Sequence, residues 1–506
     1  MKVLYGIISC VISIIILLGI MIFPSLIETP QLSFAQSLPS SSSNHSLYEF
    51  NLGYPTAGTI KLAYNNTDLN RAIESYKFFY PTMINEAMMQ VMPPGNKSNP
   101  VGIKLVAGPH HQIFTANSDT PYIFATLDLK ANGPIVIEVP AGRFMGLVDD
   151  HNMRWILDMG IYGPDKGQGG KHLILPPGYT GNVPAGYYVG HSDTWKALFG
   201  IRSVPIEGHM VKALHSLDSI KIYPLANAGD KQNVYRFVDM TNMTLPNKLL
   251  QWEDKLDYWK QLKTVIDTET VPTAFRAMYG MLQSLGIEKG IPFNPSARTT
   301  SILEEAAKRA IDEMRVNAYA NRDPGRLVWD DRNWEWLPLR PFNTTTKDIG
   351  VAAFLDLQAT DHAYFQAIGA STLMSMREIN RGSIYFTNFH DNTGEFLNGS
   401  KTYKLTVPGP VPANLFWSAT VYDVDTRSEI VTDQNKSAVR SLFEKPQSNP
   451  DGSIDIYFGP NAPEGKENHW VKTIPDKGWF VYFRIYGPQA PVLDGTWKLN
   501  NIVKMK

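Results

Sequence analysis

The spacing of hydrophobic positions changes twice along the chain. Between about residues 100 and 225, short runs rich in β-branched and aromatic residues, such as 135–139, are separated by glycine and proline. From 249 to 319, apolar residues recur every three or four positions, which is the period of an amphipathic helix. Alternating and aromatic strand-like runs return at 403–407 and 480–486. The pattern therefore predicts a mainly β protein with a helical middle.

Local signals predict where some of the helices begin. Apolar residues at 69–80 have helical spacing, and Thr67 or Asp68 is placed to cap that helix. Ser301 and Glu304 form a capping-box pattern before an alanine-rich helix. We therefore expect one helix ahead of the first β-rich part and several in the middle.

The chain has 506 residues, which is too long for one ordinary core and suggests several domains. The predicted parts are a signal peptide or membrane anchor at 1–35, a flexible tether at 36–54, an N-terminal β-sandwich domain at 55–244, a helical linker domain at 245–345 and a C-terminal β-sandwich domain at 346–506.

The N-terminus has the features of an export segment. Residues 3–27 are almost wholly apolar, Lys2 supplies a positive charge, and residues 33–35 place small side chains where a signal peptidase cleaves. The apolar run is also long enough to span a bilayer, so cleavage after Ala35 and retention as an anchor both stay open. In either case we expect the rest of the chain outside the cytoplasm, secreted or held at the outer face of the membrane.

Composition narrows the classes of partner and chemistry. Charged residues make up 19% and the formal net charge is −1, so no broad basic surface for nucleic acid is expected, and a membrane is expected to meet the chain only through its N-terminal segment. Cys10 is the single cysteine and lies in the export segment, which excludes a disulfide framework or thiol nucleophile from the exported body. No pattern indicates a cofactor, a metal or an oligomeric state. Sequons that would permit glycosylation begin at Asn44, Asn65, Asn96, Asn242, Asn343, Asn398 and Asn435.

The densest polar cluster of the N-terminal half offers candidate catalytic residues. On a strand, Asp149 and His151 would share one face, where a carboxylate and an imidazole can act as an acid–base pair or as metal ligands. Asp119 could supply a third group, and Arg143 could hold an anion. Alternatively, Asp119 caps a turn and Arg143 pairs with a buried carboxylate that holds strands together.

The glycine-rich run 163–171 is a candidate anion-binding loop. It departs from the Walker pattern because Asp165 replaces the first glycine and His172 replaces Ser or Thr. A tight loop could still present backbone amides, Lys166 and Lys171 to an anion. The alternative is a purely structural loop.

In the C-terminal half, Trp417 and Tyr422 could form an aromatic platform for a sugar ring or another apolar ligand face. They could equally belong to the sandwich core, with Asp423 and Arg427 bracing a turn. Ser418 lacks the Gly-x-Ser-x-Gly context of a hydrolase nucleophile.

Motifs in both halves carry a resemblance to known families. The N-terminal motifs are Asn-Ser-Asp-Thr-Pro-Tyr at 117–122, Leu-Asp-Leu at 127–129, and the blocks 158–160, 163–171 and 175–179. The C-terminal motifs lie at 416–418, 421–423, 426–427, 451–453, 459–460 and 484–488, and linker motifs lie at 286–290 and 292–293. The chain resembles the paired domain-of-unknown-function families 1254, in its N-terminal half, and 1214, in its C-terminal half. The resemblance implies an immunoglobulin-like N-terminal sandwich, a helical middle and a jelly-roll-like C-terminal domain, and it implies no established reaction.

Two functional hypotheses follow. The first is a hydrolase-like enzyme that acts on a small molecule or glycan, with Asp119, Asp149 and His151 near its cleft. The second is a non-catalytic ligand-binding protein of the envelope that uses Trp417, Tyr422 and the glycine-rich loop. An enzyme needs titratable groups that converge in one pocket, whereas a binding protein needs only a suitably lined cleft.

Overall fold

The computed structural model describes residues 47–93, 100–229, 234–375 and 377–505. The described residues divide into two units at the boundary between Leu62 and Ala63. In the first unit, β1 (Phe50–Asn51) and β2 (Tyr54–Pro55) pair antiparallel before the start of α1 (Ala57–Gln90). The predicted export segment lies outside the described residues. Within the described residues, no helix is long and apolar enough to cross a membrane.

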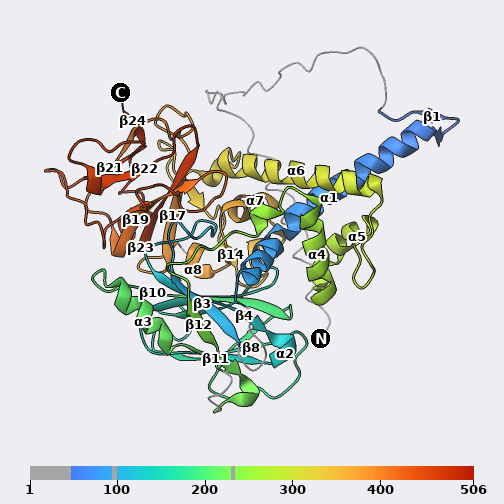
Figure 1. Cartoon of the computed structure of the whole chain (residues 1–506), viewed down its shortest axis with the longest axis horizontal. Helices are drawn as coiled ribbons and strands as arrows, with labels where there is room; N and C mark the ends of the chain where they lie inside the picture. Colours follow the sequence, from blue (N-terminus) through green and yellow to red (C-terminus); the bar gives the residue numbers. More distant parts are fainter. Residues whose placement is uncertain (1–46, 94–99, 230–233, 376, 506) are drawn as a thin grey trace, which may run out of the picture. The chain divides into compact units, whose positions relative to one another are not determined.

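Two sheets build the N-terminal β-rich part (Figure 1). In sheet order, the six-stranded sheet contains β12 (Arg236–Asp239), β3 (Val101–Val106), β4 (Pro121–Asp128), β10 (Lys196–Ser203), β6 (Phe144–Asp150) and β7 (Trp155–Gly160). The four-stranded sheet contains β11 (Lys221–Pro224), β5 (Ile135–Val139), β8 (Gly170–Leu175) and β9 (Tyr188–His191). The short helices α2 (Leu129–Asn132) and α3 (Met210–Ser216) lie in the connections.

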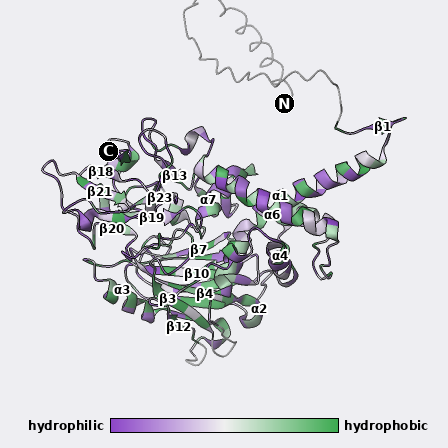
Figure 2. Ribbon diagram, turned by 45° about the horizontal axis from the view of Figure 1, so that its top comes forward, coloured by the Kyte–Doolittle hydropathy of each residue, from purple (hydrophilic) through white to green (hydrophobic). Residues whose placement is uncertain are grey.

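The core of this part lies between the two sheets. Strand β4 sends Ile123, Ala125 and Leu127 into the core, where they join Ile135 and Ile137 of β5. Side chains alternate along a strand, so the intervening residues of β4 point to the other face of the large sheet. Figure 2 shows hydrophobic residues along β3, β4 and β10 of that sheet.

The middle of the chain is helical, as predicted. It contains α4 (Leu256–Thr268), α5 (Arg276–Ser284) and α6 (Ala297–Tyr319), and α5 is followed by Gly286 at a φ of 81°. From residue 63 onward α1 packs into the same core, as does α7 (Leu357–Gln366). For example, the rings of Tyr76 and Tyr258 stack with centroids 4.0 Å apart. The helical layer therefore recruits residues from both sides of the predicted 245–345 domain.

Two of the predicted helix starts are wrong. Helix α1 begins at Ala57, so Thr67 and Asp68 lie inside it and cap nothing. Helix α6 begins at Ala297 because the Ser296 side chain accepts a hydrogen bond from the Thr299 amide. Helix α6 begins with a polar turn, and the apolar residues of the first turns of α1 are exposed and spaced by two. Neither start therefore has the helical apolar periodicity on which the predictions rested.

Two further sheets build the C-terminal part. The five-stranded sheet contains β13 (Glu335–Leu337), β17 (Ser383–Asn388), β23 (Trp479–Pro488), β19 (Ala413–Asp423) and β20 (Ala438–Arg440). The four-stranded sheet contains β22 (Trp470–Lys472), β21 (Ile454–Gly459), β18 (Tyr403–Val407) and β24 (Val503–Lys504). The remaining elements are the small sheet of β14 (Phe342–Asn343), β15 (Asp348–Val351) and β16 (Phe354–Leu355), and the short helices α8 (Thr372–Ser375) and α9 (Ala490–Leu493).

The second core lies between these C-terminal sheets. Phe483 and Ile485 of β23 pack there with Leu405 of β18 and Ile456 of β21. The protein is therefore mainly β with a helical middle, which confirms the coarse prediction from hydrophobic spacing.

Candidate functional site: a cavity between the two β-rich parts

Strand β23 is buried on both of its faces. Val481, Phe483 and Ile485 point into the C-terminal core. The alternate residues Tyr482, Arg484 and Tyr486 are also buried. All ten residues of the strand are buried. Because side chains alternate along a strand, a second layer of the protein must cover the face that carries the arginine and tyrosines.

That second layer is the large N-terminal sheet. Phe199 and Ile201 of β10 point into the N-terminal core, so Leu198, Gly200 and Arg202 point the other way. The outer faces of β10 and β23 thus meet across the protein, and each presents one arginine to the space between them.

A cavity of about 150 Å³ lies between these two faces. Its walls are mostly apolar or aromatic and include Tyr122 and Phe124 of β4, whose rings stack with centroids 5.4 Å apart. Gly200 lies in the same wall, and a Cβ atom there would have only the Phe124 ring within 4 Å. The missing side chain of Gly200 therefore contributes to the open space.

The loop before β4 joins the two β-rich parts at the cavity. The Asp119 Oδ2 atom accepts hydrogen bonds from Ser418 Oγ at 2.6 Å and from Tyr486 Oη at 3.2 Å. The Tyr422 hydroxyl donates to the Ala116 carbonyl at 2.6 Å. Asp119 is therefore a bridge between the sandwiches, and it is fully buried.

Two arginines lie in the cavity wall without a carboxylate partner. Arg484 is 2% exposed and donates from Nη2 to the Thr115 carbonyl at 3.0 Å. Its Nε and Nη1 atoms have no acceptor in the described part of the chain. Arg202 is 9% exposed, donates to the hydroxyls of Tyr122 and Ser383, both at 3.4 Å, and also interacts with the phenol of Tyr385.

These guanidinium groups influence the phenol of Tyr385, which lines the same cavity. Burial alone would raise the pKa of Tyr385, but the charges of Arg202 and Arg484 outweigh burial and lower that pKa below its usual value. The two guanidinium groups therefore act together on the tyrosine of the cavity wall. Burial raises the pKa of Glu429, another buried group that interacts with Arg484, to about 7.

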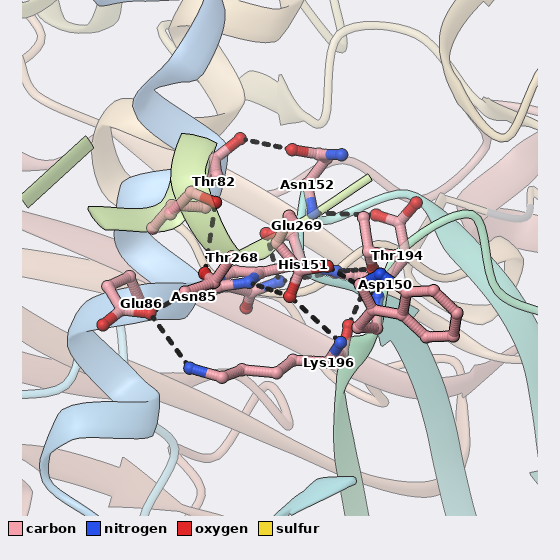
Figure 3. A network of polar contacts seen from close by, with 12 residues as sticks. Thr82, Asn85, Glu86, Asp150, His151, Asn152, Thr194, Lys196, Thr268 and Glu269 are labelled. Atoms are coloured by element: carbon pink, nitrogen blue, oxygen red, sulfur yellow. Dashed lines mark hydrogen bonds and ion pairs between the residues drawn. The ribbon is translucent and has the colours of Figure 1, made fainter. Parts of the chain in front are cut away.

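His151 belongs to a second buried network, drawn in Figure 3. Its Nε2 atom lies 3.1 Å from Glu86 Oε2 on α1, and its Nδ1 atom lies 3.0 Å from Glu269 Oε1, just after α4. Burial alone would lower the pKa of His151, but the hydrogen bonds and charges of the two glutamates raise it. Glu269 also accepts hydrogen bonds from the amides of Trp195 and Lys196. The imidazolium thus holds the helical layer against the N-terminal sheet.

Asp149 points to a different place from His151. Strand β6 ends at Asp150, and its register with β7 shifts between Val148 and Asp149. The prediction of a shared face assumed that side chains alternate regularly from Asp149 to His151. His151 lies beyond the end of the strand, so this assumption fails. Asp149 Oδ2 accepts a hydrogen bond from the Ala370 amide at 2.7 Å, and burial raises the pKa of Asp149 well above its usual value. Asp149 therefore supports the 369–372 loop beside the cavity.

The four predicted catalytic residues do not come together. Asp119 contacts Ser418 and Tyr486, Asp149 contacts the 369–372 loop, and His151 contacts two glutamates. Arg143 is exposed just before the start of β6, about 20 Å along the strand from Asp149. The structure therefore places Arg143 away from Asp149.

The glycine-rich loop has a structural anchor. Asp165 Oδ1 accepts a hydrogen bond from the Gly160 amide at 2.7 Å and lies 3.4 Å from His172 Nε2, and both of these side chains are buried. Lys166 and Lys171 are exposed. The two lysines therefore point to solvent, outside the cavity.

Trp417 and Tyr422 do not form one platform. Trp417 stacks on Phe483 in the C-terminal core, with ring centroids 5.4 Å apart. Tyr422 lies on the opposite face of β19 and packs against Phe480 and Tyr482. Both aromatic rings are buried, which agrees with the core interpretation.

Arg202 and Arg484 were not predicted from the sequence as site residues. Arg484 interrupts the aromatic run of β23, and Arg202 follows an apolar run in β10. A charged residue inside a strand that is otherwise continuously apolar is the signal that could have found them, because buried charges need a partner. Among the described residues, no group of three or more His, Cys, Asp or Glu side chains could hold a metal ion.

Comparisons with known proteins agree with this division of the chain. Residues 101–224 match the family described as "Protein of unknown function (DUF1254)", and residues 382–490 match "Protein of unknown function (DUF1214)". No curated protein matches the chain.

Among solved structures, the chain is similar to the VPA0106 protein from Vibrio parahaemolyticus, with a TM-score of 0.53 and 18% identity over 87% of this chain and 100% of that one. A putative uncharacterized protein from Burkholderia cenocepacia gives a TM-score of 0.39 and 12% identity over 88% and 96% of the two chains. The likeness to VPA0106 concerns the fold alone. The chain therefore combines a DUF1254 region in its N-terminal half with a DUF1214 region in its C-terminal half.

Proposed function

We propose that the protein is a non-catalytic binding protein that holds a small organic molecule in the cavity between β10 and β23. The observation that carries the proposal is the cavity itself, which has mostly apolar walls and a few buried polar groups. This combination is typical of small-molecule sites. In keeping with the apolar segment at 3–27, we place the protein outside the cytoplasm.

The distribution of titratable groups favours binding over hydrolysis. A hydrolytic site needs a base, a nucleophile or an activated water in one pocket. Asp149 and His151 each have their own buried partners, and neither side chain lines the cavity. Asp119 accepts hydrogen bonds from Ser418 and Tyr486. Among the described residues, no imidazole is hydrogen-bonded to Asp119 or Ser418 to activate the serine.

The proposal also assigns a role to the two β-rich parts. We take the N-terminal sheets as an immunoglobulin-like sandwich and the C-terminal sheets as a jelly-roll-like sandwich. Each pair of sheets shares one apolar core, which supports this assignment. In this arrangement each sandwich contributes one wall, so neither could bind the molecule alone.

The test is a screen of neutral, anionic and cationic small organic molecules against the intact protein by thermal shift, followed by calorimetry on the hits. The screen is repeated with Gly200→Leu, which fills the cavity, and with Gly280→Leu, which adds the same side chain at an exposed helical position with open space around it. We expect hits that bind the wild type and Gly280→Leu but not Gly200→Leu. Equal binding to both variants, or hits that are turned over, would contradict the proposal.

A further inference from the structure

The charges around the cavity do not balance. Arg202 and Arg484 both lie in its wall, and neither has a carboxylate of any described residue within 4.0 Å. Asp119 is the buried carboxylate of the same cluster, and it is committed to the hydroxyls of Ser418 and Tyr486. The two guanidinium groups and the carboxylate of Asp119 together leave one positive charge.

The other carboxylate near Arg484 does not remove this excess. Glu429 forms no ion pair within 4.0 Å with either arginine, and burial raises its pKa to about 7, so it is only partly ionised at neutral pH. Its Oε2 atom accepts a hydrogen bond from Ser437, and its Oε1 atom has no partner among the described residues. Arg440, which lies nearby, is matched by its own ion pair with Glu444 at 2.6 Å.

A buried guanidinium without a counter-charge is costly, and proteins normally pair such a group with a carboxylate or phosphate. Arg484 is almost fully buried, yet its Nε and Nη1 atoms have no acceptor in the described chain. An arginine presents its donors in a planar fork that matches a carboxylate. The free Nε and Nη1 atoms lie on different edges of the guanidinium, so each needs its own acceptor, and the oxygen of an anion is the strongest acceptor for either of them.

We propose that the molecule held between β10 and β23 is an organic monoanion, a carboxylate attached to an apolar body, whose charged end lies between Arg202 and Arg484. This inference rests on the proposed binding function and adds the chemical class of the ligand. The apolar body lies over Gly200, which is two positions before Arg202 on the same face of β10, about 7 Å along the strand.

The position of Gly200 also limits the shape of the body. The wall beside it is formed by the stacked rings of Tyr122 and Phe124, which are nearly parallel, with an interplanar angle of 5°. Leu198 continues the wall on the other side of Gly200. A flat ring or an extended alkyl chain fits against such a surface, whereas a second charged group would lose its hydration there without a partner.

The experiment compares probes that share a body and differ in charge. Benzoate and hexanoate are titrated against the wild type by calorimetry, together with benzyl alcohol, 1-hexanol, benzylamine, acetate and chloride. We expect the two carboxylates with an apolar body to bind about tenfold or more tightly than the alcohols, because a hydrogen bond to a charged group is stronger than one to a neutral group. Acetate and chloride should bind weakly, and benzylamine should not bind.

Variants locate the charged end of the probe. Arg202→Gln and Arg484→Gln should each weaken benzoate binding about tenfold or more, while benzyl alcohol binding should change little. Arg143→Gln removes an exposed arginine of the same half and should leave both affinities unchanged. If a cavity variant fails to fold, the wild-type probe series alone still decides, because it compares charges on one body.

The outcomes separate this inference from the proposed function. If alcohols bind as tightly as carboxylates and Gly200→Leu abolishes both, the cavity is a binding site and the anion inference is wrong. Chloride binding as tightly as benzoate would also overturn the inference, because the apolar body would then contribute nothing. If no probe binds, or if Gly200→Leu does not affect binding, the proposed function itself fails.

Discussion

Ser418 donates a hydrogen bond of 2.6 Å to Asp119, although the two residues are 299 positions apart in the sequence. Both side chains are fully buried, and the Oδ1 atom of Asp119 has no partner among the described residues. The bond therefore joins the two β-rich parts next to the cavity.

The first prediction concerns this bond. Ser418→Ala should lower the free energy of unfolding by about 1–3 kcal/mol, because a buried carboxylate loses a donor that water cannot replace. Urea denaturation measures the effect. The control is Ser284→Ala at an exposed position, which should stay within about 0.5 kcal/mol of the wild type. Equal effects for the two variants would contradict the role given to Ser418.

The second prediction concerns His151. His151→Ala leaves Glu86 and Glu269 buried without their shared cation, so we expect a loss of about 3–5 kcal/mol in the free energy of unfolding. His191→Ala, at an exposed position, serves as the control. If His151→Ala instead abolished ligand binding and left stability unchanged, the result would support the functional role of His151 that was predicted from the sequence.

The third prediction gives the pH dependence of that network. The two glutamates raise the pKa of His151 in the folded protein, so its contribution to stability is complete below the ordinary histidine pKa of about 6.5. That contribution is lost as the pH rises through the higher folded value. The difference in unfolding free energy between the wild type and His151→Gln should therefore shrink as the pH rises above about 6.5. A difference that grows over this range would show that His151 is neutral when folded.

The acidic side of the same network should behave in the opposite way. Burial alone would raise the pKa of Glu86, but His151 and neighbouring groups lower it. Its contribution is therefore complete above the ordinary glutamate pKa and is lost as the pH falls through the lower folded value. The free energies of unfolding of the wild type and Glu86→Gln are compared at acidic pH. A difference between them that does not shrink as the pH falls would contradict this prediction.

The fourth prediction concerns Arg427, which the sequence analysis assigned only to a turn. It is fully buried, donates from Nη2 to both oxygens of Glu253 at 2.7 and 2.9 Å, and lies over the rings of Phe114 and Phe365. Arg427→Met should cost about 3–5 kcal/mol in unfolding free energy because it leaves Glu253 buried and unpaired.

A double-mutant cycle separates the ion pair at Arg427 from simple packing. Adding Glu253→Gln to Arg427→Met should recover part of the lost stability, because the unpaired charge is removed. Arg309→Met at an exposed helical position is the control, and it should have little effect. Strictly additive losses in the double mutant would show that the pair is not coupled.

The fifth prediction concerns location. Because residues 3–27 are apolar and residues 33–35 resemble a cleavage site, the body of the protein should be found outside the cytoplasm. Cell fractionation, with N-terminal sequencing of the recovered protein, distinguishes a cleaved form that starts at Gln36 from an anchored form. Recovery of the full-length chain in the soluble cytoplasm would contradict export.

Hydrophobic spacing in the sequence determined much of the fold. The runs at 135–139, 403–407 and 480–486 became β5, β18 and β23 with boundaries within two residues. The period of three to four became the helices of the middle, and α5 ends before Gly286 at a positive φ. These features could be predicted because each depends on neighbours within a few positions, where burial of one face imposes a fixed period.

The candidate site depended on tertiary structure. Asp149 and His151 were expected on one face, but the strand ends between them, and each is held by a partner more than 60 positions away, such as Ala370 or Glu86. Arg202 and Arg484 interrupt apolar strands, a local signal that the sequence analysis did not use, and nothing local indicates that the outer faces of β10 and β23 meet. The alternation of side chains along a strand determines which residues share a face. Which element covers that face depends on long-range packing. This packing alone placed two buried guanidinium groups beside one cavity.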